Sequence, residues 1–271
     1  MRTAVIHLND PLGQKLARET TASRVLGYAI APAPEGFQAL VRAENLIDTP
    51  SGQRFTLIVP NGRVTVDTAL VGRYNVENLL AVAAVLCDAG VSAEDIARRL
   101  NSLTPPPGRM ERYGGDGQPL VVVDYAHTPD ALENALRALR DVATQRRGRL
   151  CVVFGCGGDR DPGKRPEMGA IAARCADRVM VTSDNPRSED PQAIIDAILS
   201  GVLHADSCLD RAEAISRSIN DAAAADVILL AGKGHEDYQE IAGERRPFSD
   251  AALAQTLLKH WGTPLAQEDM T

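Results

Sequence analysis

Four polar loops in this chain carry residue types that suit the binding of a small charged molecule. Each loop follows a short apolar run, and each is dense in charge, in glycine or in both. The loops cover residues 124–129, 155–161, 184–187 and 232–237. Carboxylates, guanidinium groups and accessible backbone amides can together recognise a molecule that has charges of both signs.

The loop Asp184-Asn185-Pro186-Arg187, called the tetrad below, gives the clearest signal. Its arginine offers a planar fork of donors that matches a carboxylate with two parallel hydrogen bonds. Its proline fixes its own φ and biases Asn185 toward an extended backbone. The tetrad therefore predicts a rigid holder for a carboxylate. The alternative is a solvated turn with a surface arginine, because Asn-Pro is also a common turn signal.

The other loops supply complementary groups. The glycines within residues 155–158 let backbone amides come close to a ligand. Arg160 and Arg187 could bind two carboxylates, and Glu236 could accept hydrogen bonds from an ammonium group. This combination suits a zwitterion such as an amino acid. For Glu236, the alternative is a helix-capping or solvated acid.

Three other features of these loops give weaker signals. His127 and His235 could act as ligands or bases, but each is alone in its loop, so an ordinary hydrogen-bonded histidine is an equal alternative. Residues 158–165 mimic the phosphate-binding pattern GxxxxGK followed by Ser or Thr, yet Arg165 stands in place of the hydroxyl that would hold magnesium. We expect neither a phosphate loop there nor a GxGxxG dinucleotide site.

The apolar runs before the loops predict the scaffold that brings them together. These runs lack alternation, as expected of strands covered on both faces. They lie at residues 120–123, 150–154, 179–181 and 227–230. Thr128-Pro129-Asp130 predicts a helix start through a capping hydroxyl, a proline at the first helical position and an acid that complements the helix dipole. Further helices are predicted near residues 166–175, 191–200, 210–222 and 249–258. The pattern indicates an α/β domain with a mainly parallel sheet, whose ligands bind beyond the carboxyl ends of the strands.

The first hundred residues have a different pattern. A strand is predicted at residues 25–30, and alternation over 37–46 and 54–70, with Asn61-Gly62 inside the second run, predicts a hairpin. A helix is predicted from Asn75 to about Ala89, where Gly90 stops it, and a second from the cap Ser92 to about Leu103. The run Pro105-Pro106-Pro107-Gly108 breaks regular structure. We therefore expect two domains, residues 1–104 and 105–271.

Composition narrows the class of protein. The 271 residues carry a formal net charge of −7 and only 4% aromatics, which argues against a nucleic-acid partner. No apolar run is long enough to span a bilayer, so no membrane partner is expected. The five cysteines show no CxxC pair and the histidines no HExxH, so we expect no metal site and a cytoplasmic, reducing location.

The ordered motifs identify a family resemblance. The segments 108–111, 124–132, 154–161, 184–187 and 231–239, together with 74–81 upstream, resemble the Mur ligase family in its meso-diaminopimelate-adding form. The resemblance covers residues from about Ala4 to about Trp261. It implies a Rossmann-like C-terminal ligase domain with a mainly parallel sheet, preceded by part of the central ATP-binding domain.

The resemblance implies a reaction and a set of site residues. Members of the family activate a carboxylate of UDP-MurNAc-L-Ala-D-Glu with ATP and join it to the amine of diaminopimelate, in peptidoglycan precursor synthesis. The residues implied to hold diaminopimelate are Arg160, Asp184, Asn185, Pro186, Arg187, Gly232 and Glu236. Asn78, Arg109 and Asp124 match positions on the adenine and ribose side of ATP. Arg187 would pair with the carboxylate that lysine lacks, which favours diaminopimelate over lysine. The resemblance assigns no catalytic residue.

The chain departs from the family pattern at its start. Full-length members begin with a UDP-binding domain, and their central domain opens with a Gly-rich phosphate loop; this chain joins the pattern near Ala4. ATP and magnesium are implied, but the lysine that the family carbamylates to hold magnesium has no match here. We therefore expect a form truncated at the N-terminus that is inactive alone. One alternative is a non-catalytic binding or scaffold protein. The other is a related ligase such as folylpolyglutamate or cyanophycin synthetase, and the tetrad and residues 232–236 argue against this second alternative.

Overall fold

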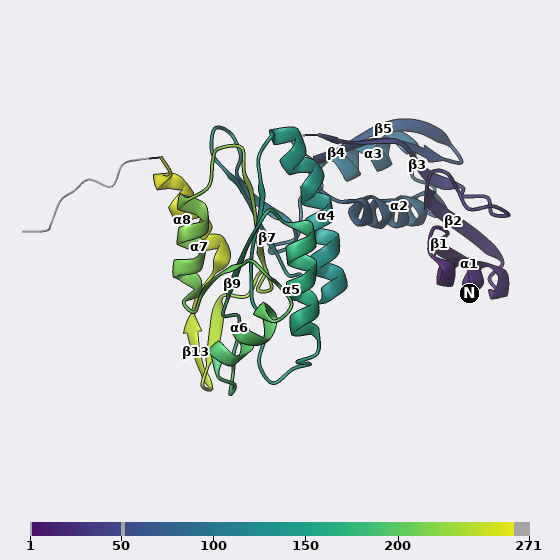
Figure 1. The fold of residues 1–271 in the computed structure, drawn as a ribbon. Coiled ribbons are helices and arrows are strands. Elements are labelled where there is room, and N and C mark those ends of the chain that lie inside the picture. Colours follow the sequence, from purple (N-terminus) through teal and green to yellow (C-terminus); the bar gives the residue numbers. More distant parts are fainter. Residues whose placement is uncertain (1, 50–51, 263–271) are drawn as a thin grey trace, which may run out of the picture. The chain divides into compact units, whose positions relative to one another are not determined.

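The chain forms two compact units, Met1–Thr104 and Pro105–Thr271. The structure is a computed structural model, and it describes residues 2–49 and 52–262. Each unit has its own sheet and its own hydrophobic core. In Figure 1 the first unit runs from purple to blue and the second from teal to yellow.

The first unit is built on a five-stranded sheet in the order β1-β2-β3-β4-β5. Its strands are β1 (Thr3–His7), β2 (Arg24–Ile30), β3 (Val41–Thr49), β4 (Gly52–Val59) and β5 (Gly62–Thr68). Strands β1 to β3 pair in parallel, whereas β3, β4 and β5 pair antiparallel. The predicted hairpin at Asn61-Gly62 is confirmed, because Val59 pairs with Gly62 where β4 turns into β5.

The helices of the first unit differ in burial, since two of them pack an apolar side on this sheet and the first leaves Leu12 and Leu16 exposed. They are α1 (Pro11–Glu19), α2 (Arg73–Asp88) and α3 (Ala93–Asn101). Leu80 of α2 and Ile96 of α3 are fully buried in a core that they share with β3, β4 and β5. Both predicted helices are confirmed, with Ser92 capping α3 and Gly90 at a φ of +81° behind α2. The sequence patterns did not predict β1 or α1. Asp10 caps α1 by accepting a hydrogen bond from the Gly13 amide at 3.0 Å.

The second unit has a six-stranded sheet in the order β10-β9-β8-β11-β7-β6 and a separate hairpin, β12–β13. Its strands are β6 (Glu111–Gly114), β7 (Leu120–Asp124), β8 (Leu150–Phe154), β9 (Arg178–Thr182), β10 (Asp206–Cys208), β11 (Val227–Ala231), β12 (Tyr238–Ile241) and β13 (Glu244–Pro247). Only β6 pairs antiparallel within the larger sheet. The four predicted apolar strands are confirmed as β7, β8, β9 and β11, and the expected α/β class with a mainly parallel sheet is confirmed with them.

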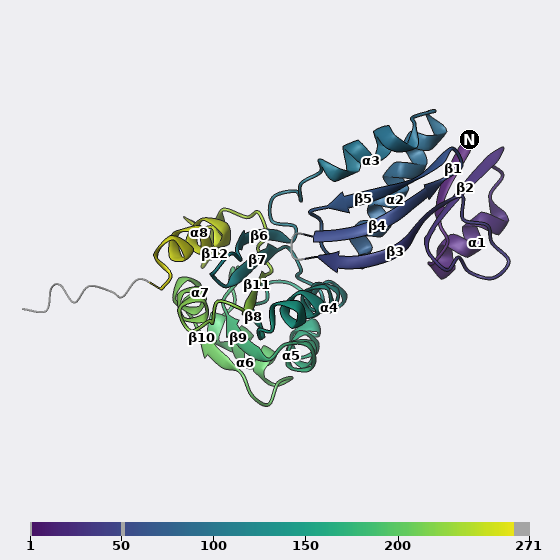
Figure 2. The same ribbon diagram turned by 90° about the horizontal axis from the view of Figure 1, so that it is seen from above.

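Helices cover both faces of this sheet, which explains why its central strands lack alternation. They are α4 (Pro129–Arg146), α5 (Lys164–Cys175), α6 (Pro191–Leu199), α7 (Arg211–Asn220) and α8 (Asp250–His260). Figure 2 shows α7 and α8 on one face and α4 and α5 on the other. Ile215 and Leu258 pack with Val153 and Ile228 in the core beneath α7 and α8. Each such buried side chain contributes about 1.5–3 kcal/mol of transfer free energy, so the sheet is a firm base for its loops.

Candidate functional site

The four polar loops meet at one cavity of about 510 Å³ in the second unit. They follow β7, β8, β9 and β11, which all run in the same direction, so their carboxyl ends share one edge of the sheet. The cavity is lined by Tyr125, His127, Gly155, Gly157, Arg160, Asp184, Asn185, Arg187, Gly232 and Glu236, among others. The predicted convergence of the loops is therefore confirmed.

The tetrad is pinned by the β12–β13 hairpin and is not a solvated turn. The Arg187 amide donates to the Glu240 carbonyl at 3.0 Å, and the Ala242 amide donates to the Arg187 carbonyl at 2.7 Å. These bonds hold Arg187 at a φ of +52°, a left-handed conformation that is uncommon for a residue other than glycine. The Arg187 Nη1 donates to the Gly158 carbonyl at 2.7 Å, so the guanidinium is fixed at the wall of the cavity.

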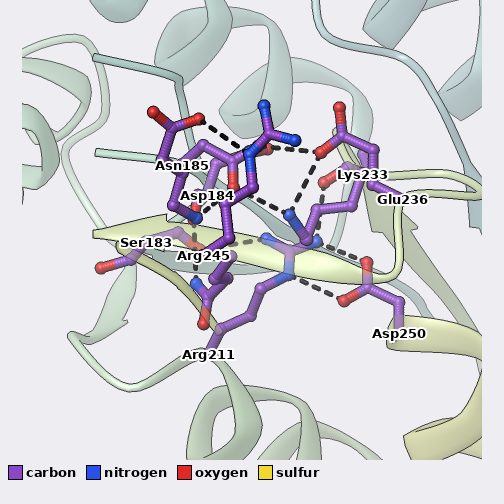
Figure 3. A network of polar contacts seen from close by, with 11 residues as sticks. Ser183, Asp184, Asn185, Arg211, Lys233, Glu236, Arg245 and Asp250 are labelled. Carbon is purple, nitrogen blue, oxygen red and sulfur yellow. Dashed lines mark hydrogen bonds and ion pairs between the residues drawn. The ribbon is translucent and has the colours of Figure 1, made fainter. Parts of the chain in front are cut away.

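A buried lysine, Lys233, organises the inner side of the cavity. Its Nζ donates to Asn185 Oδ1 at 3.1 Å and lies 3.2 Å from Glu236 Oε2, and its side chain is fully buried. Asn185 Nδ2 donates to the same Glu236 oxygen at 2.8 Å. Figure 3 shows these side chains directed toward one another from the tetrad and the Gly232 loop. Glu236 is therefore neither a helix cap nor a freely solvated acid.

Lys233 was not among the predicted site residues, although the sequence carries a signal for it. It stands between Gly232 and Gly234, directly after a buried strand. A lysine that follows a buried strand so closely has its side chain inside the domain, and a buried ammonium group needs an anionic partner. Glu236, three residues later, is that partner.

Asp184 is buried yet faces the cavity. It is 7% exposed and lines the cavity, and none of the described residues donates a hydrogen bond to its carboxylate. Burial raises the pKa of this carboxyl, while the charges of Arg211 and Lys233 act in the opposite direction. Gly232 makes room for it, because a Cβ there would lie 2.4 Å from Asp184 Oδ2. The carboxylate keeps its capacity to accept hydrogen bonds from a ligand.

The Gly-rich loop after β8 places the exposed side chain of Arg160 at the cavity. The loop is fastened to the tetrad, since the Gly158 amide donates to the Asn185 carbonyl at 2.9 Å. Ser188 Oγ donates to Asp159 at 2.7 Å, and hydrogen bonds from Ser188 lower the pKa of the Asp159 carboxyl. Arg165 stands where a phosphate loop would have a Ser or Thr hydroxyl. Its side chain is buried and pairs with Glu189 at 2.8 Å.

Two of the three residues expected on the ATP side lie together in the second unit. Asp124 accepts hydrogen bonds from the Met110 amide at 2.8 Å and from the Ala126 amide at 2.9 Å. The exposed Arg109 stacks on the ring of Tyr125, with its Cζ 4.7 Å from the ring centroid. Burial raises the pKa of the Asp124 carboxyl, and the amide hydrogen bonds oppose that rise. Asp124 therefore holds the segment that presents Arg109. Asn78 is exposed on α2, in the first unit.

The two loop histidines have ordinary surroundings. His127 Nδ1 lies 2.8 Å from the Tyr125 carbonyl, and the His235 ring lies 5.6 Å from the Tyr125 ring. Within residues 2–49 and 52–262, no group of three or more His, Cys, Asp or Glu side chains could hold a metal ion. Over the same residues, no helix is long and apolar enough to cross a membrane.

Comparison with known proteins places this site in a family. Residues 1–86 match the Mur ligase middle domain, and residues 108–234 match the Mur ligase glutamate ligase domain. The chain is 49% identical over 268 residues to a UDP-N-acetylmuramoyl-L-alanyl-D-glutamate--2,6-diaminopimelate ligase of Chromobacterium violaceum, covering 97% of this chain and 52% of the relative. A ligase of the same name from Pseudomonas aeruginosa is 47% identical, with 98% and 54% covered. The chain thus spans about half the length of the curated relatives it matches.

Solved structures agree with this assignment. A diaminopimelate ligase of the same name superimposes with a TM-score of 0.66 at 37% identity, covering 95% of this chain and 53% of that structure. Folylpolyglutamate synthase of Mycobacterium tuberculosis gives a TM-score of 0.62 at 22% identity, with 85% and 52% covered, a likeness of fold alone. The matched domains and the ordered site loops show that this chain belongs to the Mur ligase family.

Proposed function

We propose that this chain is the amino-acid-selecting part of an ATP-dependent ligase that adds meso-diaminopimelate to UDP-MurNAc-L-Ala-D-Glu. The charge pattern of the cavity carries the proposal. The guanidinium groups of Arg160 and Arg187 and the carboxylates of Asp184 and Glu236 are among the charged groups that line this cavity, together with those of Asp161, Lys164 and Glu167. At neutral pH meso-diaminopimelate has two carboxylates and two ammonium groups, so each guanidinium group can meet a carboxylate and the two acids can meet an ammonium group. Relatives that are 49% and 51% identical carry this activity in their names.

We assign a part to each group. Arg187 would receive the carboxylate at the non-reacting end, because its Nη1 is anchored to Gly158 and its other guanidinium donors have no hydrogen bond to a described residue. Asp184 and Glu236 would accept hydrogen bonds from the ammonium at that end, while Arg160 would bind the second carboxylate. Asn185, Pro186 and Gly232 would shape the cavity. Lysine has only one carboxylate and would leave the Arg187 guanidinium without a partner. The site should therefore bind lysine more weakly than diaminopimelate, because its polar group would stay unpaired.

In the proposed reaction, ATP transfers its γ-phosphoryl group to the acceptor carboxylate, and ADP leaves. The free amine of diaminopimelate then attacks the acyl carbon, forming the amide bond and releasing phosphate and a proton. This chain's contribution is to hold the amine in place for that attack. On the nucleotide side, Arg109 offers an exposed cation with a flat face, and Asp124 positions it through the Met110 amide. We retain Asn78 as a predicted nucleotide contact, and we assign no residue to magnesium.

The two units fit this division of labour. We propose that residues 1–104 belong to the central ATP-binding domain and residues 105–271 to the C-terminal ligase domain. All five cysteines are free thiols, which supports the proposal of a reducing, cytoplasmic location.

Calorimetric titration with meso-diaminopimelate and with L-lysine tests the proposal. We expect diaminopimelate to bind at least about tenfold more tightly, because lysine leaves the Arg187 guanidinium unpaired. Arg187→Ala should remove this preference. Arg174→Ala, which removes an exposed arginine paired with Glu133 on the surface of α4 and α5, is the matched control and should keep it. Equal affinity of the unmodified chain for the two amino acids would refute the proposal.

A ligation assay separates an enzyme part from a binding protein. The chain is mixed with the N-terminal half of the Chromobacterium violaceum relative, ATP, UDP-MurNAc-L-Ala-D-Glu and diaminopimelate. Formation of the amide product, lost when this chain is left out, supports the ligase. Diaminopimelate binding without any product would favour a non-catalytic binding protein.

A further inference from the structure

A buried ion pair lies directly beneath the cavity and outside it. Arg211 is the first residue of α7 and Asp250 is the first residue of α8. Both side chains have zero exposure, and they form a bidentate pair, with Nε to Oδ1 at 2.8 Å and Nη2 to Oδ2 at 2.6 Å. Neither residue is a lining residue of the cavity.

The position of Arg211 is unfavourable in two ways. A cation at a helix N-terminus opposes the helix dipole, and a fully buried charge loses its hydration. Buried pairs of this kind can often be replaced by apolar residues of similar volume without loss of stability. The pair therefore calls for an explanation beyond stabilising the core.

The remaining contacts of Arg211 supply that explanation. Its Nη1 donates to the Ser183 carbonyl at 3.3 Å, and its Nη2 donates to the Ala231 carbonyl at 3.0 Å. Ser183 directly precedes Asp184, and Ala231 directly precedes Gly232. One guanidinium thus binds the backbone at the roots of two ligand-binding loops. Figure 3 shows Arg211 with Ser183 on one side and Asp250 on the other.

The sheet sets the spacing of these two roots only indirectly, because β9 and β11 each pair with β8 and not with one another. The loops follow β9 and β11, which are not neighbours, because β8 lies between them in the strand order. No backbone ladder joins the two strands, so Arg211 provides a direct link across the end of β8. The spacing is demanding, because Asp184 Oδ2 lies within 2.4 Å of where a Gly232 Cβ would stand.

We propose that Arg211, oriented by Asp250, is a positioning residue that sets the distance between the tetrad and the Gly232 loop and so the affinity for the amino acid. The inference rests on the proposed function for its ligand, and on the strand order and hydrogen bonds for its mechanism. The fixed charge has a second effect, since Arg211 and Lys233 lower the pKa of Asp184 against the upward effects of burial, Glu236 and Asp250.

The test compares this pair with a matched pair at the opposite edge of the same sheet. Arg211→Lys keeps the charge but lacks the fork, and Arg211→Met with Asp250→Leu removes both charges. The control is Arg149→Met with Asp226→Leu, since Arg149 and Asp226 directly precede β8 and β11 and pair at 2.8 Å. Each variant is titrated with meso-diaminopimelate, and amide hydrogen exchange is followed at Gly232, whose N–H donates to the Asp124 carbonyl at 3.1 Å.

We expect both Arg211 variants to bind diaminopimelate about tenfold or more weakly and to exchange the Gly232 amide about tenfold faster. The control should lower Tm yet keep the affinity and the Gly232 exchange of the unmodified chain. If the double variant does not fold, Arg211→Lys decides. Unchanged affinity and exchange in a folded Arg211 variant would overturn the inference. If the unmodified chain does not bind diaminopimelate, the proposed function fails, and the Gly232 exchange alone decides the positioning role.

Discussion

The parallel strands of the six-stranded sheet begin at one side, called the amino edge, and end at the other, called the carboxyl edge. These two edges use charged residues in opposite ways. At the amino edge, Arg149 pairs with Asp226, whose carboxylate also accepts the Arg149 amide at 2.8 Å and the Ala223 amide at 3.0 Å. Arg146 donates there to four backbone carbonyls, those of Gly115, Gln118, Ala224 and Ala225. At the carboxyl edge, Arg160 is exposed at a cavity, and the Asp184 carboxylate receives no hydrogen bond from the described residues.

This difference separates charges that stabilise the fold from charges that can bind a ligand. Both edges are rich in arginine and aspartate, so the number of charges does not distinguish them. The two edges differ in unused hydrogen-bonding capacity. A buried polar group without a partner lowers stability unless a ligand supplies the missing hydrogen bond. The pair Arg211–Asp250 lies at the carboxyl edge but is satisfied like a pair of the amino edge, as a positioning role requires.

The largest expected effect comes from filling the space beside Asp184. Gly232→Ala places a Cβ 2.4 Å from Asp184 Oδ2 at a φ of +112°, so the loop must move. We expect diaminopimelate affinity to fall by about a hundredfold or more, measured by calorimetry. Gly243→Ala is the matched control, because Gly243 also has a positive φ, of +79°, but has open space around its Cβ position. Equal losses of affinity in the two variants would mean that backbone strain, and not crowding of Asp184, limits binding.

A smaller effect, on stability alone, is expected at the amino edge. Burial would raise the pKa of the Asp226 carboxyl, but hydrogen bonds from Arg149 and from backbone amides hold it below its usual range. A lowered pKa in the folded state gives stability that is present at neutral pH and lost as pH falls through that pKa. Asp226→Asn should therefore cost about 1–3 kcal/mol at neutral pH and reduce the loss of stability on acidification, in urea titrations at several pH values. A matching loss of diaminopimelate affinity would contradict the separation of the two edges.

The smallest effect concerns the pH dependence of binding at the carboxyl edge. Burial raises the pKa of Asp184, so its charge is lost at a higher pH than that of an exposed aspartate. Because an ammonium group needs the ionised carboxylate, diaminopimelate affinity should fall by a few-fold as pH is lowered through this raised pKa. Asp184→Asn should bind weakly and show no such step in calorimetry across that range. A step of the same size in Asp184→Asn would assign the titration to another group, such as Glu236.

Local patterns in the sequence predicted the scaffold and the convergence of its loops. The unalternated run at β8 and the cap at Thr128 are properties of neighbouring residues, and both appear as predicted. The side-chain network depends on contacts far apart in the chain. Arg211 meets Asp250 across 39 positions, and Asn185 meets Lys233 across 48, so no local pattern announces either pair.

The hairpin β12–β13 shows the same limit. Its second strand, Glu244–Pro247, is short, charged and exposed, and it lacks the alternation that predicts strands. Its partner β12 pins the backbone of Arg187, so the element that fixes the tetrad was the least visible in the sequence. The position of Asn78 on the nucleotide side stays a prediction.

A crystal structure of this chain with meso-diaminopimelate tests the central claim most directly. The account predicts the ligand in the cavity at the carboxyl edge, with one carboxylate hydrogen-bonded to Arg187 and an ammonium group to Asp184 or Glu236. Diaminopimelate bound at another surface, or in the cavity with its ammonium groups away from both carboxylates, would contradict it.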